Sequence, residues 1–238
     1  MNRIILERSQ SDQTDFIISN EDVVLHLNSV LKVKAGEKLK VALIDEGLAN
    51  VQVKSVSPQE IELEFVDEII QISHPETHLL VGASRPPTIK KVLEHGTCMG
   101  VTHFHIFKAD LSEKSYLQSK VLESNNVEGL LTLGLSQSAN LYKRPKISIY
   151  KDLQSTFESL PPARFLLSLK TQDTFDSSEI GTAAIVLAIG PERGWTTAEE
   201  ELLQAEKFIP RKISSHTLRV EIATFSALGQ LELLRGNS

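Results

Sequence analysis

The sequence predicts an α/β protein in two parts, a small β-rich domain followed by a larger domain with a buried parallel sheet. Two observations predict this fold class. The first third of the 238 residues holds short strand-like runs joined by turns, whereas strand-like and helix-like runs alternate from about residue 77. Residues 73–76 form a polar, proline-containing connection, so we expect domains at residues 1–72 and 73–238.

The first domain is expected to contain one helix and three strands. Ser19 or Asn20 can cap the helix, and apolar residues at helical spacing are expected to form its core face. These residues are Val23, Val24, Leu27, Val30 and Leu31. Strands are expected at residues 37–44, 48–56 and 59–66. The last strand alternates apolar residues with glutamates, as a strand with one buried and one solvated face does.

The second domain is expected to alternate strands and helices. Strands are predicted at residues 78–83, 101–107, 146–150, 164–169 and 183–189. Helices are predicted at residues 88–99, 126–141, 152–160, 197–207 and 221–234. Because the strands are apolar along their whole length, they are expected to form a parallel sheet buried on both faces.

Composition excludes several classes of protein. Hydrophobic residues make up 41% and charged residues 24% of the chain, which favours a globular protein over a disordered one. The N-terminus lacks the apolar region of a signal peptide, and no window is apolar enough to span a membrane. We therefore expect a cytoplasmic protein without a membrane partner. The net charge of −6 arises within residues 1–70, and it argues weakly against binding that depends on phosphate neutralisation.

Metal-dependent chemistry is not expected. A single cysteine, Cys98, excludes an intrachain disulfide and a cysteine-rich zinc site, and we expect it to pack within a helix. Of the seven histidines, only His103 and His105 form a close pair, on one face of a strand. With no carboxylate partner in the pattern, this pair is more typical of packing or polar surface than of a metal site.

The segment around residues 185–195 is the most informative. An apolar strand runs into Gly190, Pro191, Glu192, Arg193 and Gly194, and a helix capped by Thr196 or Thr197 follows. Glycines allow a ligand to approach the backbone, and the helix N-terminus offers free amide donors. An ordinary strand-to-helix turn explains the same residues, and local chemistry leaves both interpretations open.

A second segment, residues 213–223, leads from a polar turn into the last helix through Arg219 and Glu221. An arginine and a glutamate two positions apart near a helix start are ambiguous, and the local pattern alone favours a structural role over a catalytic one. In the structural role, Arg219 is paired to a carboxylate and Glu221 is favoured by the helix dipole.

Together, in this order and at this separation, the two segments resemble the C-terminal signatures of the RsmE-type 16S rRNA uridine N3-methyltransferase family of the SPOUT superfamily. The first reads IGPERGWTTAE from Ile189 to Glu199, and the second matches at Leu218, Arg219, Glu221 and Ala223. Ser214 replaces a family glycine, His216 an arginine and Ile222 a threonine. Further similarity lies at Arg3, residues 26–36, residues 91–101 and Gln137-Ser138, where Ala139 and Asn140 replace Gly-Arg.

The resemblance implies a PUA-like β-barrel RNA-binding domain, a trefoil-knotted SPOUT methyltransferase domain, and a homodimer with its active sites at the subunit interface. It implies S-adenosyl-L-methionine as cofactor and 16S ribosomal RNA as partner. The implied cofactor-binding residues are Leu167, Ser168, Ile189, Gly190, Pro191, Glu192, Gly194, Ile213, Ser214, Thr217 and Leu218. Ser214 fits this site if its φ is negative or its side chain points away from the adenosine.

The implied catalytic residues are Arg219, which would stabilise charge on the uracil, and Glu221, which would accept its proton or hold Arg219. The implied RNA contacts are Arg3, Arg193, Gln137 and Ser138. Two alternatives remain open: a SPOUT methyltransferase for another RNA position, and a non-catalytic RNA-binding or ribosome-assembly protein with a decayed cofactor pocket.

Overall fold

The computed structural model describes residues 3–7 and 15–236. The chain divides into two compact units. The N-terminal unit comprises Met1–Ser73 with Leu135–Lys143, and the C-terminal unit comprises His74–Gly134 with Arg144–Ser238. The late segment is tied to the N-terminal unit by backbone hydrogen bonds, since Arg3 donates to Ser136 at 3.2 Å and Asp45 donates to Tyr142 at 2.9 Å.

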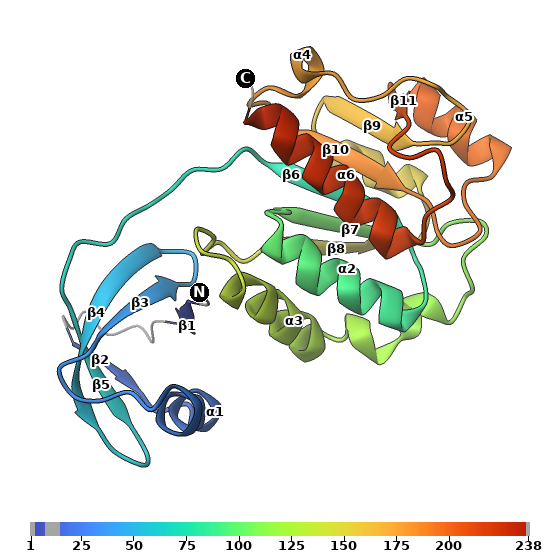
Figure 1. Ribbon diagram of the computed structural model, residues 1–238. Coiled ribbons are helices and arrows are strands. Elements are labelled where there is room, and N and C mark those ends of the chain that lie inside the picture. The colour runs from blue at the N-terminus through green and yellow to red at the C-terminus, as the bar shows by residue number, and fades with distance from the viewer. Residues whose placement is uncertain (1–2, 8–14, 237–238) are drawn as a thin grey trace. The chain divides into compact units, whose positions relative to one another are not determined.

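The N-terminal unit is built on one curled, five-stranded sheet with the order β1-β3-β4-β5-β2 (Figure 1). The strands are β1 (Ile4–Leu6), β2 (Asp15–Ile18), β3 (Lys38–Leu43), β4 (Gly47–Val56) and β5 (Ile61–Phe65). The three strands expected from the sequence are confirmed. In β5, Ile61 and Leu63 are fully buried while Glu64 is exposed, as its alternating pattern predicts.

The helix of this unit differs from the prediction. Asn20 caps α1 (Glu21–Leu25) by accepting a hydrogen bond from the backbone of Val23, but the chain then widens into a π-helix, η1 (His26–Leu31). A π-helix has more residues per turn than an α-helix. Residues spaced three and seven positions apart, which would share the buried face of an α-helix, therefore turn away from the core. Val24 and Leu27 are buried as expected, whereas Val30 and Leu31 are 64% and 49% exposed.

The C-terminal unit contains a six-stranded sheet, all parallel, with the order β11-β9-β10-β6-β7-β8. Its strands are β6 (Thr77–Gly82), β7 (His103–Phe107), β8 (Lys146–Tyr150), β9 (Ala163–Leu167), β10 (Ile185–Ile189) and β11 (Ile209–Arg211). The expected buried parallel sheet is confirmed. The short edge strand β11 was not expected, because its three residues include Pro210 and carry no periodic pattern.

Both faces of this sheet are covered. Helices α2 (Pro86–Cys98), α3 (Ser124–Ser136) and α6 (Val220–Arg235) share a core with alternate strand residues such as Leu79 and Leu187. The short helix η4 (Gln154–Ser159) and α5 (Thr197–Ala205) cover the other face, where they pack on residues of opposite parity such as Leu80 and Val186 (Figure 1). The remaining helices are η2 (Tyr116–Gln118), η3 (Lys120–Leu122) and α4 (Ser177–Ile180).

Two helix predictions were wrong in extent or type. The helix expected to reach residue 141 ends at Ser136, and the segment after it belongs to the other unit. The helix expected at residues 152–160 is a 3₁₀-helix, in which the Thr156 hydroxyl donates to the Leu153 carbonyl at 2.7 Å. Such local side-chain hydrogen bonds compete with regular α-helical structure.

Cys98 lies half-buried at the end of α2, and burial raises the pKa of its thiol. The thiol is therefore held in the protonated, unreactive form, which agrees with the packing role expected for it. Within the part of the chain that the structure describes, we find no helix long and apolar enough to cross a bilayer.

Candidate functional site

A pocket of about 550 Å³ lies in the C-terminal unit, where the strands β9, β10 and β11 end. In a parallel sheet the carboxyl ends of the strands meet at one edge, and ligands bind there in crevices between loops. The lining comes from three loops after these strands and from the start of α6. The lining residues are Leu167–Lys170, Gly190–Trp195, Glu200, Arg211, Ile213, Ser214, His216–Val220 and Ala223.

The loop after β10 is compact because it closes on itself. The backbone N–H of Gly194 donates to the carbonyl of Pro191 at 2.8 Å, and Gly194 has φ +74°, which a residue with a Cβ rarely adopts. At Gly190 an added Cβ would come within 3.2 Å of the Gly194 backbone and of the Trp195 ring. Both constraints are also met in an ordinary tight turn, and what distinguishes this loop is that it forms the wall of a pocket.

The helix after this loop begins with a capping box. Thr196 accepts a hydrogen bond from the Glu199 amide at 3.2 Å, and the Glu199 carboxylate accepts one from the Thr196 amide at 2.9 Å. Glu199 is buried and also accepts from the Asp110 amide at 2.9 Å. Trp195 is held as well, since its Nε1 donates to the Leu167 carbonyl at 3.3 Å. The loop is therefore fixed at its helical end.

The loop that ends at α6 is anchored by Gln230, whose side-chain amide donates to the Ile213 carbonyl at 3.0 Å. Ser214 satisfies the condition set by the sequence, because positive φ values at described non-glycine positions occur at Lys32, Asp45 and Lys207. Its hydroxyl accepts from the His216 amide at 3.0 Å and so organises the loop from within. A serine is therefore compatible with the backbone conformation at this glycine position.

Two cations at the pocket, Arg193 and Arg219, are exposed and form no hydrogen bond or ion pair within the described part of the chain, although Arg219 acts on Glu221 through its charge. By contrast, Lys170 pairs with Glu200 and Arg211 pairs with Glu179. Arg219 occupies the N-cap position of α6 without capping it through its side chain. Its guanidinium is therefore available to a ligand.

Glu221 lies outside the pocket lining. It is buried in the first turn of α6, and its carboxylate lies 3.3 Å from the Lys91 ammonium. Burial by itself raises the pKa of Glu221, but its own backbone amide and Lys91 stabilise the carboxylate more, so the pKa is lowered overall. Lys91 is thus the ion-pair partner of Glu221, and the charge of Arg219 makes a smaller contribution to lowering the same pKa.

Most of the residues expected at the site come together. Of the expected cofactor-binding residues, all except Ile189 line the pocket, and Ile189 is the buried last residue of β10. Arg3, Gln137 and Ser138 belong to the N-terminal unit. The lining residues that sequence reasoning did not assign to the site include Trp195, which lies inside the first signature segment, and Glu200 and Arg211, which lie outside both segments.

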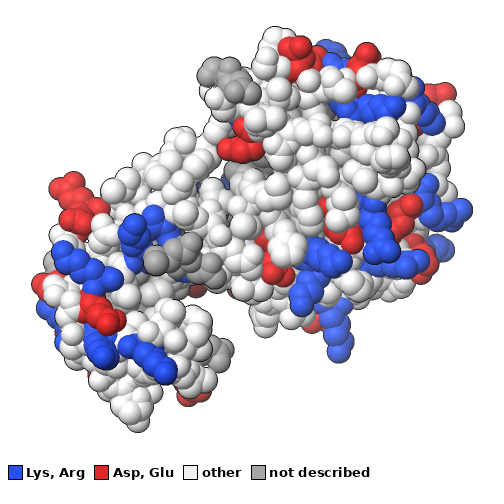
Figure 2. All heavy atoms as spheres, in the orientation of Figure 1, with Lys and Arg blue, Asp and Glu red and all other residues white. Residues whose placement is uncertain are grey.

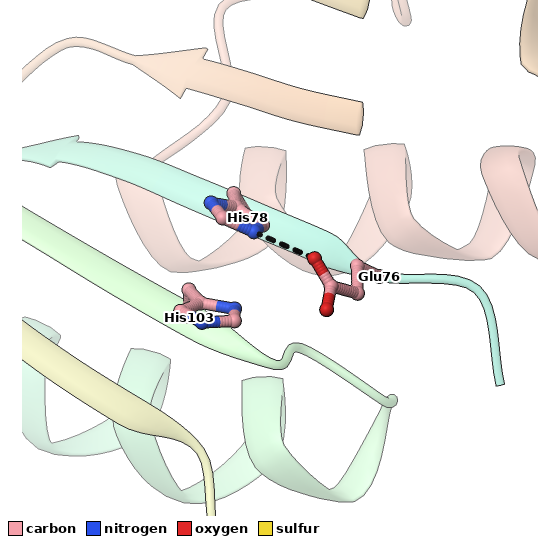
Figure 3. A group of neighbouring side chains, drawn as sticks. All are labelled: Glu76, His78 and His103. Atoms are coloured by element: carbon pink, nitrogen blue, oxygen red, sulfur yellow. Dashed lines mark hydrogen bonds and ion pairs between the residues drawn. The ribbon is translucent and has the colours of Figure 1, made fainter. Parts of the chain in front are cut away.

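A second cluster lies at the start of β6 and β7. Ligand atoms of Glu76, His78 and His103 lie within 4.8 Å of one another (Figure 3). The sequence pattern around His103 and His105 holds no carboxylate, but the pairing of β6 with β7 brings His78 and the preceding Glu76 beside His103. The ring of His103 stacks on that of His78 with a centroid separation of 4.0 Å.

A parallel sheet covered on both faces, with a loop-walled pocket at the carboxyl ends of its strands, defines an α/β protein that binds a cofactor-sized molecule. Residues 72–232 match the family model described as RNA methyltransferase domain. The chain is 30% identical over 217 residues to the ribosomal RNA small subunit methyltransferase E 1 of Borreliella burgdorferi, covering 87% of this chain and 88% of that protein. It belongs to the ribosomal RNA small subunit methyltransferase E family.

Two further proteins are similar along nearly the whole chain. The ribosomal RNA small subunit methyltransferase E of Treponema pallidum is 26% identical over 243 residues, which cover 95% of this chain and 89% of that protein. The crystal structure of a ribosomal RNA small subunit methyltransferase E from Neisseria gonorrhoeae bound to S-adenosyl methionine has a TM-score of 0.82 at 18% identity, covering 99% of this chain and 98% of that one. The expected SPOUT-type α/β fold preceded by a small barrel-like domain is confirmed.

Proposed function

We propose that this protein transfers a methyl group from S-adenosyl-L-methionine to N3 of a uridine in 16S ribosomal RNA. Membership of the family and the names of the relatives support methylation of small-subunit ribosomal RNA. The cofactor is supported by the S-adenosyl methionine bound in the Neisseria gonorrhoeae structure. The observation that carries the proposal is the pocket at the carboxyl edge of the sheet, which the two signature segments build together.

The pocket suits the cofactor in size and chemistry. A cavity of about 550 Å³ is within the usual range for small-molecule sites, roughly 300–1,000 Å³. Apolar side chains such as Leu167, Ile213 and Leu218 line it and offer a surface for an adenine ring. Backbone groups of the three loops would bind the polar parts of the cofactor. When bound, S-adenosyl-L-methionine supplies an electrophilic methyl group.

Arg219 is the residue that we assign to the chemical step. Uracil N3 carries a weakly acidic proton, and negative charge develops on the ring as that proton leaves. A cation held beside the ring stabilises this charge, and Arg219 lies at the pocket without a competing partner. We assign Glu221 a supporting role, because its carboxylate is held by Lys91 and is stabilised by the charge of Arg219 two residues before it.

The proposed RNA contacts are Arg193 of the C-terminal unit and Arg3, Gln137 and Ser138 of the N-terminal unit. On the face that Figure 2 shows, acidic and basic side chains alternate on the N-terminal unit and form no continuous acidic surface. One such pair is Lys54 with Glu64, at 3.6 Å. The acidic excess of this unit is therefore compatible with binding RNA, and we propose that role for its barrel-like sheet.

We propose further that the protein acts as a homodimer in the cytoplasm and needs neither a membrane nor a metal for methyl transfer. The family resemblance implies that both subunits build each active site. The apolar face of α6 gives part of the support, because Ile222 and Leu233 remain 46% and 66% exposed. Leu228 and Leu231, in contrast, are buried in the core of their own chain.

Mass-spectrometric mapping of ribosomal RNA from cells with and without the protein tests the proposal. The expected result is loss of one N3-methyluridine from 16S RNA in its absence. A methyl group lost from another nucleotide would favour the alternative of a different RNA position, which the departures at Ala139, Asn140, His216 and Ile222 motivate. If no methyl group is lost and the purified protein binds no cofactor, the pocket is decayed and the protein acts as an RNA-binding or assembly factor.

A further inference from the structure

The histidine cluster lies at the opposite end of the sheet from the cofactor pocket. Glu76 directly precedes β6 and His78 is its second residue, while His103 begins β7 and pairs with His78 in register. In parallel strands, residues at these positions share the amino-terminal edge, whereas the pocket lies at the carboxyl edge. The cluster is therefore separate from the residues assigned to methyl transfer.

A chain of hydrogen bonds fixes the orientation of the protons in this cluster. The chain starts at the Thr156 backbone carbonyl, which accepts a hydrogen bond from the Ser159 hydroxyl at 2.9 Å. Because Ser159 has one proton to donate, the Tyr150 hydroxyl must donate to Ser159, at 2.9 Å. Tyr150 must then accept from Nδ1 of His105, at 3.2 Å. His105 Nε2 is left to accept from Nδ1 of His78, at 3.0 Å.

With the hydrogen bonds in this direction, the proton of a neutral His78 ring lies on Nδ1, and Nε2 carries none. Both His78 and His105 are buried, which disfavours a second proton on either ring. The bare Nε2 lies 3.5 Å from Oε2 of Glu76, so two electron-rich atoms face each other. That distance is long for a hydrogen bond, whose typical length is about 2.9 Å. It is close to the roughly 3.3 Å that separates two ligands of a tetrahedral zinc ion with bonds of about 2.05 Å.

We propose that Glu76, His78 and His103 bind a divalent transition-metal ion, of which Zn²⁺ is the type. Two imidazoles and one carboxylate form a known zinc donor set that leaves a fourth position for water. His105 orients His78 by accepting its other ring proton, as outer-shell partners of metal-bound histidines do. Glu76 is exposed and His103 half-buried, so solvent has access to the ligand atoms (Figure 3).

Binding requires small rotations. The three ligand atoms lie within 4.8 Å of one another, which is wider than the tetrahedral spacing, so the His103 ring and the Glu76 carboxylate must turn toward His78. Glu76 is exposed, so its carboxylate can turn, whereas a turn of the half-buried His103 ring changes its stacking on His78 and its contact with the Thr102 hydroxyl, 3.0 Å from Nδ1. Lys146 pairs with His103 in register and its positive charge opposes a metal ion. Affinity is accordingly expected to rise in a Lys146→Met variant.

The ion would stabilise the fold without taking part in methyl transfer. It would join the starts of two neighbouring strands, β6 and β7, and would neutralise the repulsion between His78 and Glu76. A ligand that binds only the folded state raises the melting temperature in proportion to the logarithm of its concentration. The proposal therefore predicts zinc-dependent stability together with unchanged affinity for S-adenosyl-L-methionine.

Calorimetric titration of the chelator-treated, full-length protein with Zn²⁺ tests the site. One ion per chain is expected, with a rise in melting temperature, and Co²⁺ should give the visible absorption of a four-coordinate ion. Glu76→Gln and His103→Asn should each weaken binding by at least about 10-fold, and Tyr150→Phe by about 10- to 100-fold because it removes the proton relay. His26→Asn changes an exposed histidine of the other unit and is the matched control.

Absence of saturable zinc binding would overturn the proposal. So would binding that Glu76→Gln and His103→Asn leave unchanged, since the ion would then occupy other side chains. Glu76→Gln replaces an exposed residue and preserves its shape. If this variant loses zinc binding while the melting temperature of the metal-free protein is unchanged, the loss is due to the missing carboxylate and not to unfolding.

Discussion

At the scale of single residues, the pocket contrasts cations that are paired with cations that are not. Arg211 forms an ion pair with Glu179, and Lys170 forms one with Glu200. Both ion pairs hold loops in place. Arg219 and Arg193 keep their charge at the pocket surface. Sequence reasoning left a catalytic and a structural role open for Arg219. No described carboxylate forms an ion pair with it, and its electrostatic effect on Glu221 is smaller than that of Lys91, so we propose the catalytic role.

Arg219→Ala is therefore expected to leave cofactor affinity and melting temperature nearly unchanged while lowering single-turnover methylation by about 10²- to 10³-fold. Arg219→Lys should recover only part of the rate, because an ammonium lacks the planar donor geometry of guanidinium. Lys151→Ala removes a surface cation outside the pocket lining and serves as the control. Wild-type turnover in a folded Arg219→Ala protein would exclude the catalytic role.

The buried histidines make stability depend on pH. Burial, with a smaller contribution from neighbouring histidines, lowers the pKa of His78 and of His105 to about 4. A base whose pKa is depressed by folding stabilises the protein above its unfolded pKa of about 6.5, and this contribution is lost as the pH falls toward 4. With a chelator present, the free energy of unfolding in urea is expected to decrease between pH 6.5 and 5.

Burial also lowers the pKa of His103, so His105→Gln removes one of three such titrations and should reduce that slope. The interval above pH 5 is diagnostic, because the carboxylates with lowered pKa, which include Glu221, titrate in more acidic solution. An unfolding free energy that stays constant from pH 6.5 to 5 would contradict the prediction. It would indicate that the histidine rings bind protons as readily in the folded state as in the unfolded state.

At the scale of elements, the loop after β10 is constrained on both sides. Gly190→Val places branched carbons against the Gly194 backbone and the Trp195 ring, both already 3.2 Å from a Cβ. We expect at least a 10-fold loss of S-adenosyl-L-methionine affinity by calorimetry, since the loop must shift into the pocket or away from it. Gly129→Val, on an exposed face of α3 with no atom within 4 Å, is the control and should retain full affinity.

The capping box of α5 gives a second test at this scale. Thr196→Ala removes one cap acceptor and is expected to cost about 1 kcal/mol of stability. Glu199→Ala should cost more, because it leaves the amides of Thr196 and Asp110 without an acceptor. Thr197→Ala, one residue further on, changes an exposed side chain and should be nearly neutral. Urea unfolding of the three variants gives the order, and equal losses for all of them would contradict it.

The elements also show where sequence patterns stop being informative. Apolar strands such as β6 and β10 can be predicted from the sequence, because a strand buried on both faces of a sheet is apolar at nearly every position. The π-helix η1 does not, since the residues from His26 to Leu31 are equally compatible with α-helical hydrogen bonding. The edge strands β1 and β11 are three residues long, too short for any period to appear.

At the scale of the whole molecule, the sequence predicted which segments build the pocket. It did not predict which strands are neighbours in the rest of the sheet. The two signature segments were expected to meet because a family resemblance orders them, and the structure places nearly all the expected residues at one cavity. The meeting of Glu76 and His78 with His103 depends on the pairing of β6 with β7, which no local pattern specifies. Strand order is set by packing over the entire sheet.

The proposed homodimer is the prediction that belongs to the whole molecule. Light scattering at micromolar concentration should give twice the chain mass of 26.4 kDa. If the exposed part of α6 lies in the interface, Ile222→Glu should yield a folded monomer, because it would bury a charge without a partner. Leu25→Glu, at an apolar position in the other unit that is 65% exposed, should remain dimeric.

Because the proposal assigns residues of both subunits to each active site, the Ile222→Glu monomer should lose methylation while keeping its melting temperature within a few degrees. A monomeric wild-type protein would reject the homodimer outright. A dimer that survives Ile222→Glu would keep the homodimer and exclude this face of α6, since about half of the Ile222 side chain is exposed in a single chain and tolerates a charge there. The two results therefore separate the existence of the dimer from the location of its interface.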